Sequence, residues 1–275
     1  MNSTFARTED GTLQLTITIP AADVKKASST VVDQTVDNAK VPGFRKGKAP
    51  KKLVEEATST EALKEETLKK LLPEAYIQAI TEHKLRPIVN PKIHVQKLDD
   101  GGDWVFTAET CEMPEVTLGE YKKAVKDVTA KSKIIVPGKE QETVNVDDIL
   151  MPIVQKASVA IPKILVEFEV DRLLSQTLDE IKSLGLTLEQ YLGSTNKTPE
   201  KLREDFAEKA QNDIKVEFVL AKIAETEKIT VEEKEVEEAI HTAKTDAERA
   251  NLEQNRHLLS SIIRQQKTLD FLRNL

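Results

Sequence analysis

The chain is organised around the stretch Lys40-Val41-Pro42-Gly43-Phe44-Arg45-Lys46-Gly47-Lys48-Ala49-Pro50-Lys51-Lys52. This stretch holds six basic residues and no acidic one, although the whole chain has a formal net charge of −7. Its prolines and glycines exclude a continuous helix or a central strand, so we expect a loop. Cations pair with phosphate oxygens, and the ring of Phe44 can stack on a base. The stretch therefore predicts docking on a large anionic surface rich in RNA, and a solvated turn is the alternative that it leaves open.

The composition favours helical bodies with large solvated surfaces over a compact enzyme core. Charged residues make up 32% of the 275 residues and apolar residues 39%, but aromatic residues only 4%. This length accommodates about two domains of ordinary size. We see no basic start followed by an apolar run, and no stretch of about 18 apolar residues. The sequence therefore predicts a soluble, cytoplasmic protein with no membrane partner.

The first part of the chain reads as an α+β module over residues 1–115. Apolar residues alternate over residues 13–19, which predicts a half-buried strand, and the turn sequence Asp99-Asp100-Gly101-Gly102 predicts a hairpin. Trp104 and Phe106 then fall on one face of the second hairpin strand, with Val105 on the other. Helices are expected at 22–39, at 50–57 beginning with Pro50, and from residue 60 onward with a kink or restart at Pro73. The hairpin strands are expected at 88–98 and 103–113.

The rest of the chain predicts a linker and then a helical body. Residues 116–144 are rich in lysine, valine and threonine, and we expect them to form an extended linker. Helical periodicity dominates residues 145–275, with Thr198 and Thr230 as expected N-caps and a last helix over residues 246–272. The fold class is therefore an α+β N-terminal module followed by an elongated all-α C-terminal body with helical arms.

The sequence offers no recognisable catalytic chemistry. It has no glycine-rich phosphate loop and no dinucleotide fingerprint. No two of its four histidines, His83, His94, His241 and His257, have the i, i+4 spacing of a helical zinc site. The single cysteine, Cys111, excludes an internal disulfide and reads as a small apolar strand residue. We expect no catalytic residue, no cofactor and no metal, and a binding role instead.

Part of the basic stretch, Gly43-Phe44-Arg45-Lys46-Gly47-Lys48-Ala49-Pro50, closely resembles the ribosome-docking signature of the trigger factor family. Members of this family are bacterial chaperones that meet nascent chains at the ribosomal tunnel exit. Three later stretches are similar to helical patterns of the same family, in the same order. They are Ile161-Pro162-Lys163-Ile164-Leu165-Val166-Glu167-Phe168-Glu169, Gly185-Leu186-Thr187-Leu188-Glu189-Gln190-Tyr191-Leu192, and the run from Ile223-Ala224-Glu225 to Lys234-Glu235-Val236.

One departure from the family pattern is large. Trigger factors usually carry an FKBP-type prolyl isomerase domain between the docking module and the helical body. The corresponding interval here, about 116–145, is far below the roughly 50 residues of an ordinary domain, and its only aromatic residue is Tyr121. The resemblance therefore implies a chaperone without the isomerase domain, and we expect no enzyme activity.

The resemblance also implies partners and binding residues. It implies docking near the exit tunnel, on ribosomal protein and ribosomal RNA, by Gly43, Phe44, Arg45, Lys46, Gly47 and Lys48. It implies helical arms that bind nascent or unfolded polypeptides without ATP, and it leaves open whether the protein forms a homodimer. For these arms the resemblance implies substrate-binding side chains, and the candidates are Leu188, Tyr191, Leu192, Phe206, Ile262, Ile263, Phe271 and Leu272. Ordinary helix core is the alternative reading of each. The alternative is an RNA-binding or assembly factor with one dedicated protein partner.

Overall fold

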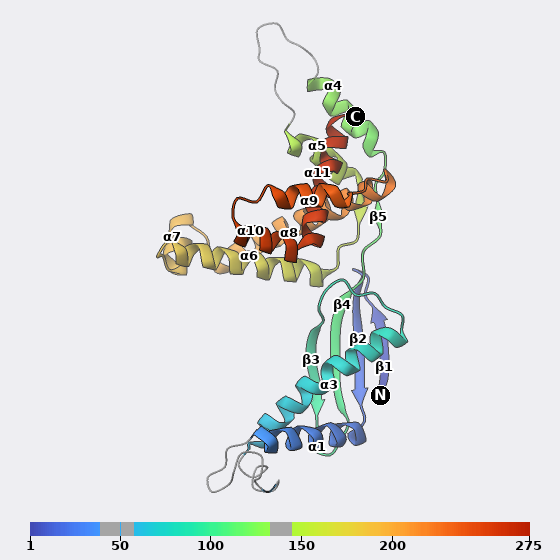
Figure 1. Ribbon diagram of the computed structural model, residues 1–275, viewed down its shortest axis with the longest axis vertical. Coiled ribbons are helices and arrows are strands. Elements are labelled where there is room, and N and C mark those ends of the chain that lie inside the picture. Colours follow the sequence, from blue (N-terminus) through green and yellow to red (C-terminus); the bar gives the residue numbers. More distant parts are fainter. Residues whose placement is uncertain (39–49, 51–57, 133–144) are drawn as a thin grey trace. The chain divides into compact units, whose positions relative to one another are not determined.

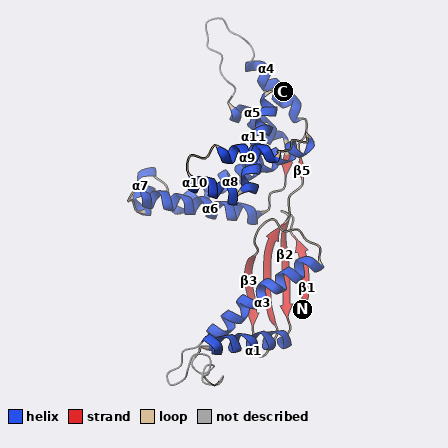
Figure 2. Ribbon diagram, in the orientation of Figure 1, coloured by secondary structure: helices blue, strands red, loops and turns tan. Residues whose placement is uncertain are grey.

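The computed structural model describes residues 1–38, 50, 58–132 and 145–275 (Figure 1). It divides the chain into two compact units. The first unit comprises Met1–Met113 with Pro162–Ile164, and the second comprises Pro114–Ile161 with Leu165–Leu275. The predicted fold class is confirmed, because the first unit combines a sheet with helices and the second is almost entirely helical (Figure 2).

The first unit is built on a four-stranded antiparallel sheet. Its strands are β1 (Asn2–Arg7), β2 (Thr12–Ile19), β3 (Lys92–Leu98) and β4 (Trp104–Cys111), in the order β1-β2-β4-β3. The predicted strand and hairpin are confirmed as β2 and the β3–β4 pair. Strand β1 was not predicted, because its sequence NSTFAR lacks an apolar alternation.

Two helices of the described part of this unit cover one face of the sheet. Helices α1 (Ala21–Asn38) and α3 (Thr60–Glu82) bury the apolar side of β2 and β4. The core consists of strand residues Leu13, Leu15, Ile17, Ile19, Trp104, Phe106 and Ala108 with helix residues Val24, Ala27, Leu71, Ala75 and Ala79. Pro73 lies inside α3 without ending it, so of the predicted kink or restart the restart is wrong, and the kink stays a prediction. Pro73 is exposed, so the carbonyl group that it leaves unpaired can bond to water. The helix expected at residues 50–57 lies outside the described residues, apart from Pro50.

The expected extended linker is in part a folded element of the second unit. Strand β5 (Val116–Thr117) pairs with β6 (Ser158–Val159), and helix α4 (Tyr121–Ser132) follows β5. Tyr121 and Val125 of α4 are buried in a core that α5 (Val146–Lys156) shares. The expectation is therefore wrong for residues 116–132, where lysines alternate with a buried stripe at helical spacing. Residues 133–144 lie outside the described part of the chain.

Six further helices follow among the described residues, and the first of them begins within the first unit. They are α6 (Lys163–Ser183), α7 (Leu188–Thr195), α8 (Pro199–Thr226), α9 (Glu233–His241), α10 (Asp246–Gln254) and α11 (Arg256–Arg273). Residues from α4, α5, α8 and α11, with the C-cap residue of α5, share one core: Tyr121, Val125, Ile149, Ile153, Ala157, Val219, Leu220, Ile223 and Leu272. No described helix is long and apolar enough to cross a membrane.

Two predicted helix boundaries differ from the structure, and one agrees. The last helix is interrupted at Asn255, whose backbone is not helical (φ −108°, ψ 32°) and whose side-chain amide donates 2.9 Å to the carbonyl oxygen of Asn251. Helix α9 starts two residues later than Thr230 predicted, because the N–H of Glu232 donates to the carboxylate of Glu235. The predicted N-cap Thr198 is confirmed, since its side chain accepts from the N–H of Lys201.

Candidate functional site

The structure describes the helices before and after the basic stretch. Gly43, Phe44, Arg45, Lys46, Gly47 and Lys48 lie outside the described residues. Helix α1 ends before the stretch, and α3 begins after it with the hydroxyl of Ser59 as its N-cap. The end of α1 and the start of α3 lie at the same end of the first unit (Figure 1).

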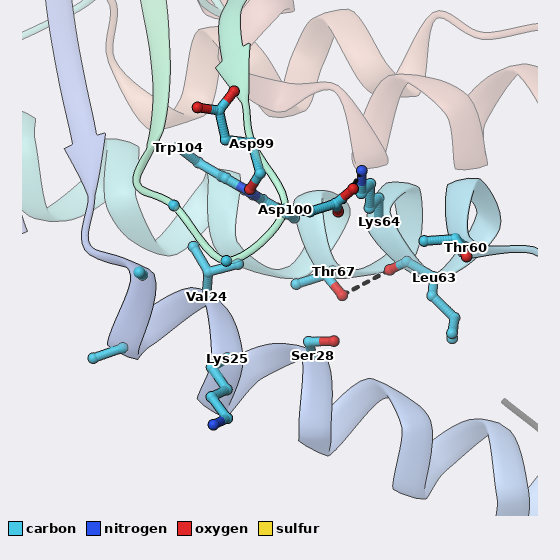
Figure 3. Close-up of a pocket in the computed structure, with 14 residues that line it drawn as sticks. Val24, Lys25, Ser28, Thr60, Leu63, Lys64, Thr67, Asp99, Asp100 and Trp104 are labelled. Carbon is cyan, nitrogen blue, oxygen red and sulfur yellow. Dashed lines mark hydrogen bonds and ion pairs between the residues drawn. The ribbon is translucent and has the colours of Figure 1, made fainter. Parts of the chain in front are cut away.

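A cavity of about 560 Å³ lies beside these two helices, under the β3–β4 turn (Figure 3). Val24, Leu63 and the indole of Trp104 form its apolar walls. Lys64 and Asp100 form an ion pair of 2.6 Å at its edge. No sequence pattern predicts this cavity, because its walls come from three separate segments. Lys25 and Lys64 balance Asp99 and Asp100 around it, so it does not select a ligand by net charge.

Exposed leucines gather at the end of α6 and the start of α7. Leu184 is 73% exposed, Leu186 42% and Leu188 36%. The turn that presents them is a Schellman motif: Gly185 has φ +71°, and the N–H of Leu186 donates 3.1 Å to the carbonyl of Ile181. No residue of α7 is buried. The end of the arm that α6 and α7 form therefore exposes apolar side chains to water.

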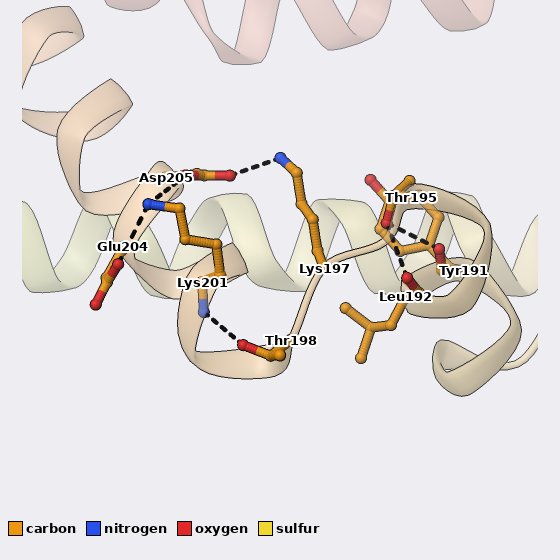
Figure 4. Close-up of polar contacts among 8 residues, drawn as sticks. All are labelled: Tyr191, Leu192, Thr195, Lys197, Thr198, Lys201, Glu204 and Asp205. Atoms are coloured by element: carbon orange, nitrogen blue, oxygen red, sulfur yellow. Dashed lines mark hydrogen bonds and ion pairs between the residues drawn. The ribbon is translucent and has the colours of Figure 1, made fainter.

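Polar contacts hold the end of α7 against the start of α8 (Figure 4). The hydroxyl of Thr195 donates 2.9 Å to the carbonyl of Tyr191, and the hydroxyl of Thr198 accepts from the N–H of Lys201 at 3.2 Å. Lys197 bridges to Asp205 at 2.6 Å, and this hydrogen bond holds the pKa of Asp205 below its usual value. A cap and an ion pair therefore fix the backbone of the α7–α8 connection, which follows the exposed leucines in the chain.

A second pair of exposed apolar residues lies on α11. Leu258 is 61% exposed and Ile262 is 54% exposed. Their spacing of four residues places them on the same face of the helix. This face and the end of the α6–α7 arm are two separate apolar surfaces within the second unit.

Comparisons with known proteins identify the family. The family model described as "Bacterial trigger factor protein (TF)" matches residues 1–145, and the model for the C-terminus of the same protein matches residues 121–274. The chain belongs to the trigger factor family. Trigger factors of Staphylococcus epidermidis and Staphylococcus aureus are 39% and 38% identical to it over 122 residues. These matches span 44% of this chain and only 28% of the relatives' length.

A solved structure supports the fold. It comes from work on promiscuous substrate recognition in the folding and assembly activities of the trigger factor chaperone. Its TM-score to this chain is 0.69, with 15% sequence identity, and the match covers 100% of this chain and 99% of the other. The order of an α+β unit before a helical body is therefore the arrangement of a trigger factor.

The predicted substrate-binding residues differ in their exposure to solvent. Leu188 and Ile262 are exposed, and Tyr191, Leu192 and Ile263 are half-buried. Phe206 is also half-buried and packs on a small core of Val170, Leu173 and Ala210.

Two of the predicted substrate-binding residues belong to the core of the second unit. Leu272 is 0% exposed, so the expectation that it contacts substrate is corrected: it is a core residue. Phe271 packs against the same core. Helical periodicity alone could not separate these residues from the exposed ones, because both kinds repeat every three or four positions.

Sequence reasoning missed Leu184, Leu186 and Leu258 as candidate binding residues. The signal for the first two was present, because a glycine that ends a helix lies between them. Side chains beside such a turn are exposed, because no neighbouring helix packs against them.

The described residues contain no group of three or more His, Cys, Asp or Glu arranged to hold a metal ion. Cys111 is fully buried, and burial raises the pKa of its thiol to about 11, with a smaller contribution from the charge of Asp10. The structure therefore assigns Cys111 to packing, as the sequence predicted.

Proposed function

We propose that this trigger factor is an ATP-independent, ribosome-associated chaperone that binds nascent or unfolded polypeptides in the cytoplasm. One observation carries the proposal: the N- and C-terminal family models match in order over residues 1–145 and 121–274. The docking signature at residues 43–50 and the exposed leucines of the arm support it. Neither a nucleotide nor a catalytic group is required, because weak apolar contacts release as the client buries its own apolar surface.

In this proposal the basic stretch docks the protein near the exit tunnel. Phe44, Arg45 and Lys46 contact ribosomal RNA and protein, and Gly43 and Gly47 let the backbone present them. Lys48 adds a further cation. Binding should weaken with salt, because cations that neutralise phosphates release counterions.

Cosedimentation with ribosomes across a salt series tests the docking role. Replacing Phe44, Arg45 and Lys46 by alanine should abolish cosedimentation and leave the circular dichroism spectrum unchanged. A matched control removes two exposed cations and one exposed apolar residue elsewhere in the same unit: Arg86→Ala, Ile88→Ala and Lys97→Ala. The control should bind as the wild type does. Undiminished binding of the first variant would remove the docking role.

Clients are proposed to bind the exposed apolar side chains of the second unit. Leu184, Leu186 and Leu188 form the first contact surface, with Tyr191 and Leu192 at its border. Leu258 and Ile262 form the second. A leucine side chain that becomes fully buried contributes about 1.5–3 kcal/mol, so several partial contacts give weak, exchangeable binding.

Aggregation assays with several unrelated unfolded proteins test this surface. The triple change Leu184→Ser, Leu186→Ser and Leu188→Ser should reduce protection of every client. A control with three similarly exposed but scattered residues, Ile77→Ser, Met113→Ser and Met151→Ser, should protect normally. Protection of one protein only would instead favour a dedicated assembly factor.

Prolyl isomerase activity is not part of this proposal. Both matched family models are trigger factor N- and C-terminal models, and the interval between the docking module and α5 is short. A protease-coupled assay with a proline-containing peptide should show no turnover above buffer. Turnover would contradict the proposal that the protein is a binding chaperone only.

A further inference from the structure

We propose that the open edge of β1 binds an extended segment of unfolded polypeptide as an additional strand of the sheet. This inference rests on the proposed chaperone function, because the occupant is a client chain. It adds a site in the first unit that recognises polypeptide backbone, whereas the leucine surfaces of the second unit recognise side chains. Main-chain hydrogen bonds along a sheet edge bind any extended chain that supplies matching N–H and C=O groups.

The edge of β1 is open over most of its length. Residues 4–7 pair with β2 on one side, and among the described residues nothing else bonds to their backbone. Only the start of the strand is closed, where a ring nitrogen of His83 lies 3.3 Å from the carbonyl oxygen of Ser3. Unpaired backbone groups in a row are a template for another strand.

The opposite edge of the same sheet, β3, has features that prevent pairing with another strand. Strand β1 lacks these features. Strand β3 carries Lys92 and Lys97, and its register shifts between Val95 and Lys97, so Gln96 forms a bulge. Lysines and bulges are the devices that guard a sheet edge against pairing. Strand β1 has no proline and no bulge, and its single charge, Arg7, is paired with Glu112 at 2.6 Å.

Side chains along β1 define the kind of segment that fits. Phe5 is 45% exposed and lies opposite Leu15, on the face that the helices cover. The ring of Phe5 contacts His83 with centroids 4.9 Å apart. Thr4 and Ala6 point to the other face. An added strand would therefore alternate, with apolar residues beside Phe5 and polar residues beside Thr4 and Ala6.

Binding of a short peptide of alternating valine and threonine to the full chain tests the proposal. Two N-methylated versions are compared, one methylated at the valine amides and one at the threonine amides. Each version removes the donors along one edge of the peptide only. We expect one version to bind at least about tenfold more weakly, measured by anisotropy of a labelled peptide, and the other to bind as the parent does.

A matched pair of variants locates the site. Phe5 and Val95 are 45% and 46% exposed, and both lie on the helix-covered face of an edge strand. Phe5→Lys should weaken peptide binding at least about tenfold, because it adds an edge charge and removes the anchoring ring. Val95→Lys adds the same charge to the protected edge and should change binding less than about twofold. If Phe5→Lys fails to fold, the methylated peptides decide the question on the wild-type protein.

Three outcomes would overturn the edge site. The first is equal binding of both methylated peptides and the parent, and the second is equal damage from Phe5→Lys and Val95→Lys. The third is a Phe5→Lys effect confined to self-association of the protein, since the occupant would then be a second copy. If the wild type still prevents aggregation of unfolded clients in any of these cases, the proposed chaperone function stands. If it neither prevents aggregation nor binds the peptide, both proposals fail.

Discussion

At the scale of single residues, Asp10 shows how one side chain organises a turn. Its carboxylate accepts from the side chains of Thr8 and Thr12 and, at 2.9 Å, from the N–H of Lys163 in the same unit. Burial alone would raise the pKa of this carboxyl, but the combined hydrogen bonds hold it well below its usual value. A carboxylate with a depressed pKa stabilises the fold above its unfolded pKa and loses that contribution as the pH falls.

Replacing Asp10 by alanine should therefore lower the free energy of unfolding by about 1–2 kcal/mol at neutral pH. The difference from the wild type should shrink as the pH falls below about 3.9, the pKa of an unfolded aspartate. Urea titrations followed by the fluorescence of Trp104, the only tryptophan, measure the free energy of unfolding of the first unit. Glu9→Ala, an exposed change in the same turn, serves as the control and should have little effect. A difference independent of pH would contradict the assigned cause.

Cys111 should react slowly while the protein is folded. A pKa of about 11 in place of the ordinary thiol pKa of 9.0 lowers the thiolate fraction at pH 8 about 100-fold, and the side chain is fully buried. Ellman's reagent should label it at least about 100-fold more slowly in buffer than in denaturant. The stabilisation linked to this raised pKa is present below the unfolded pKa and is lost as the pH rises toward 11. Fast labelling in buffer would show that the strand opens.

At the scale of secondary-structure elements, capping decides how firmly α7 is held. Helix α7 has no buried residue, and the hydroxyl of Thr187 and the side chain of Gln190 form its capping box. Helix α8 has the same kind of N-cap in Thr198. In addition, Leu202, Ala210 and other side chains of α8 are buried in the protein. The same cap therefore matters more to the helix that lacks a core.

Removing each cap should give different results. Thr187→Ala and Thr198→Ala each remove about 1 kcal/mol of capping. Hydrogen exchange should accelerate throughout α7 in the first variant, but only in the first turn of α8 in the second. Equal loss of protection along both helices would show that α7 has tertiary support of its own.

The elements also show what the sequence could predict. Residues 13–19 alternate because one face of β2 is buried, and the Asp-Gly turn fixes the hairpin, so local pattern was sufficient there. Local pattern was insufficient for β1, whose two faces are both largely exposed, and for α4, whose buried stripe is hidden among lysines. The leucines at Gly185 needed the fold as well, since only the arrangement of helices shows which apolar positions are left uncovered.

At the scale of the whole molecule, the chain has separate cores for its two units. Residues of the sheet, α1 and α3 form one core, and residues of α4, α5, α8 and α11 form another. Each unit has its own contact network, so we expect each to unfold as its own cooperative system. Trp104 reports only on the first unit, and the far-ultraviolet helical signal comes mainly from the second.

Two matched core changes test this independence. Leu15 and Leu272 are both 0% exposed, and each change to alanine should lower the stability of its own unit by about 2–5 kcal/mol. Leu15→Ala should move the urea transition of Trp104 fluorescence and leave most of the helical transition in place. Leu272→Ala should do the reverse. If both variants shift both transitions equally, the two cores unfold as one system, and each unit depends on the other for its stability.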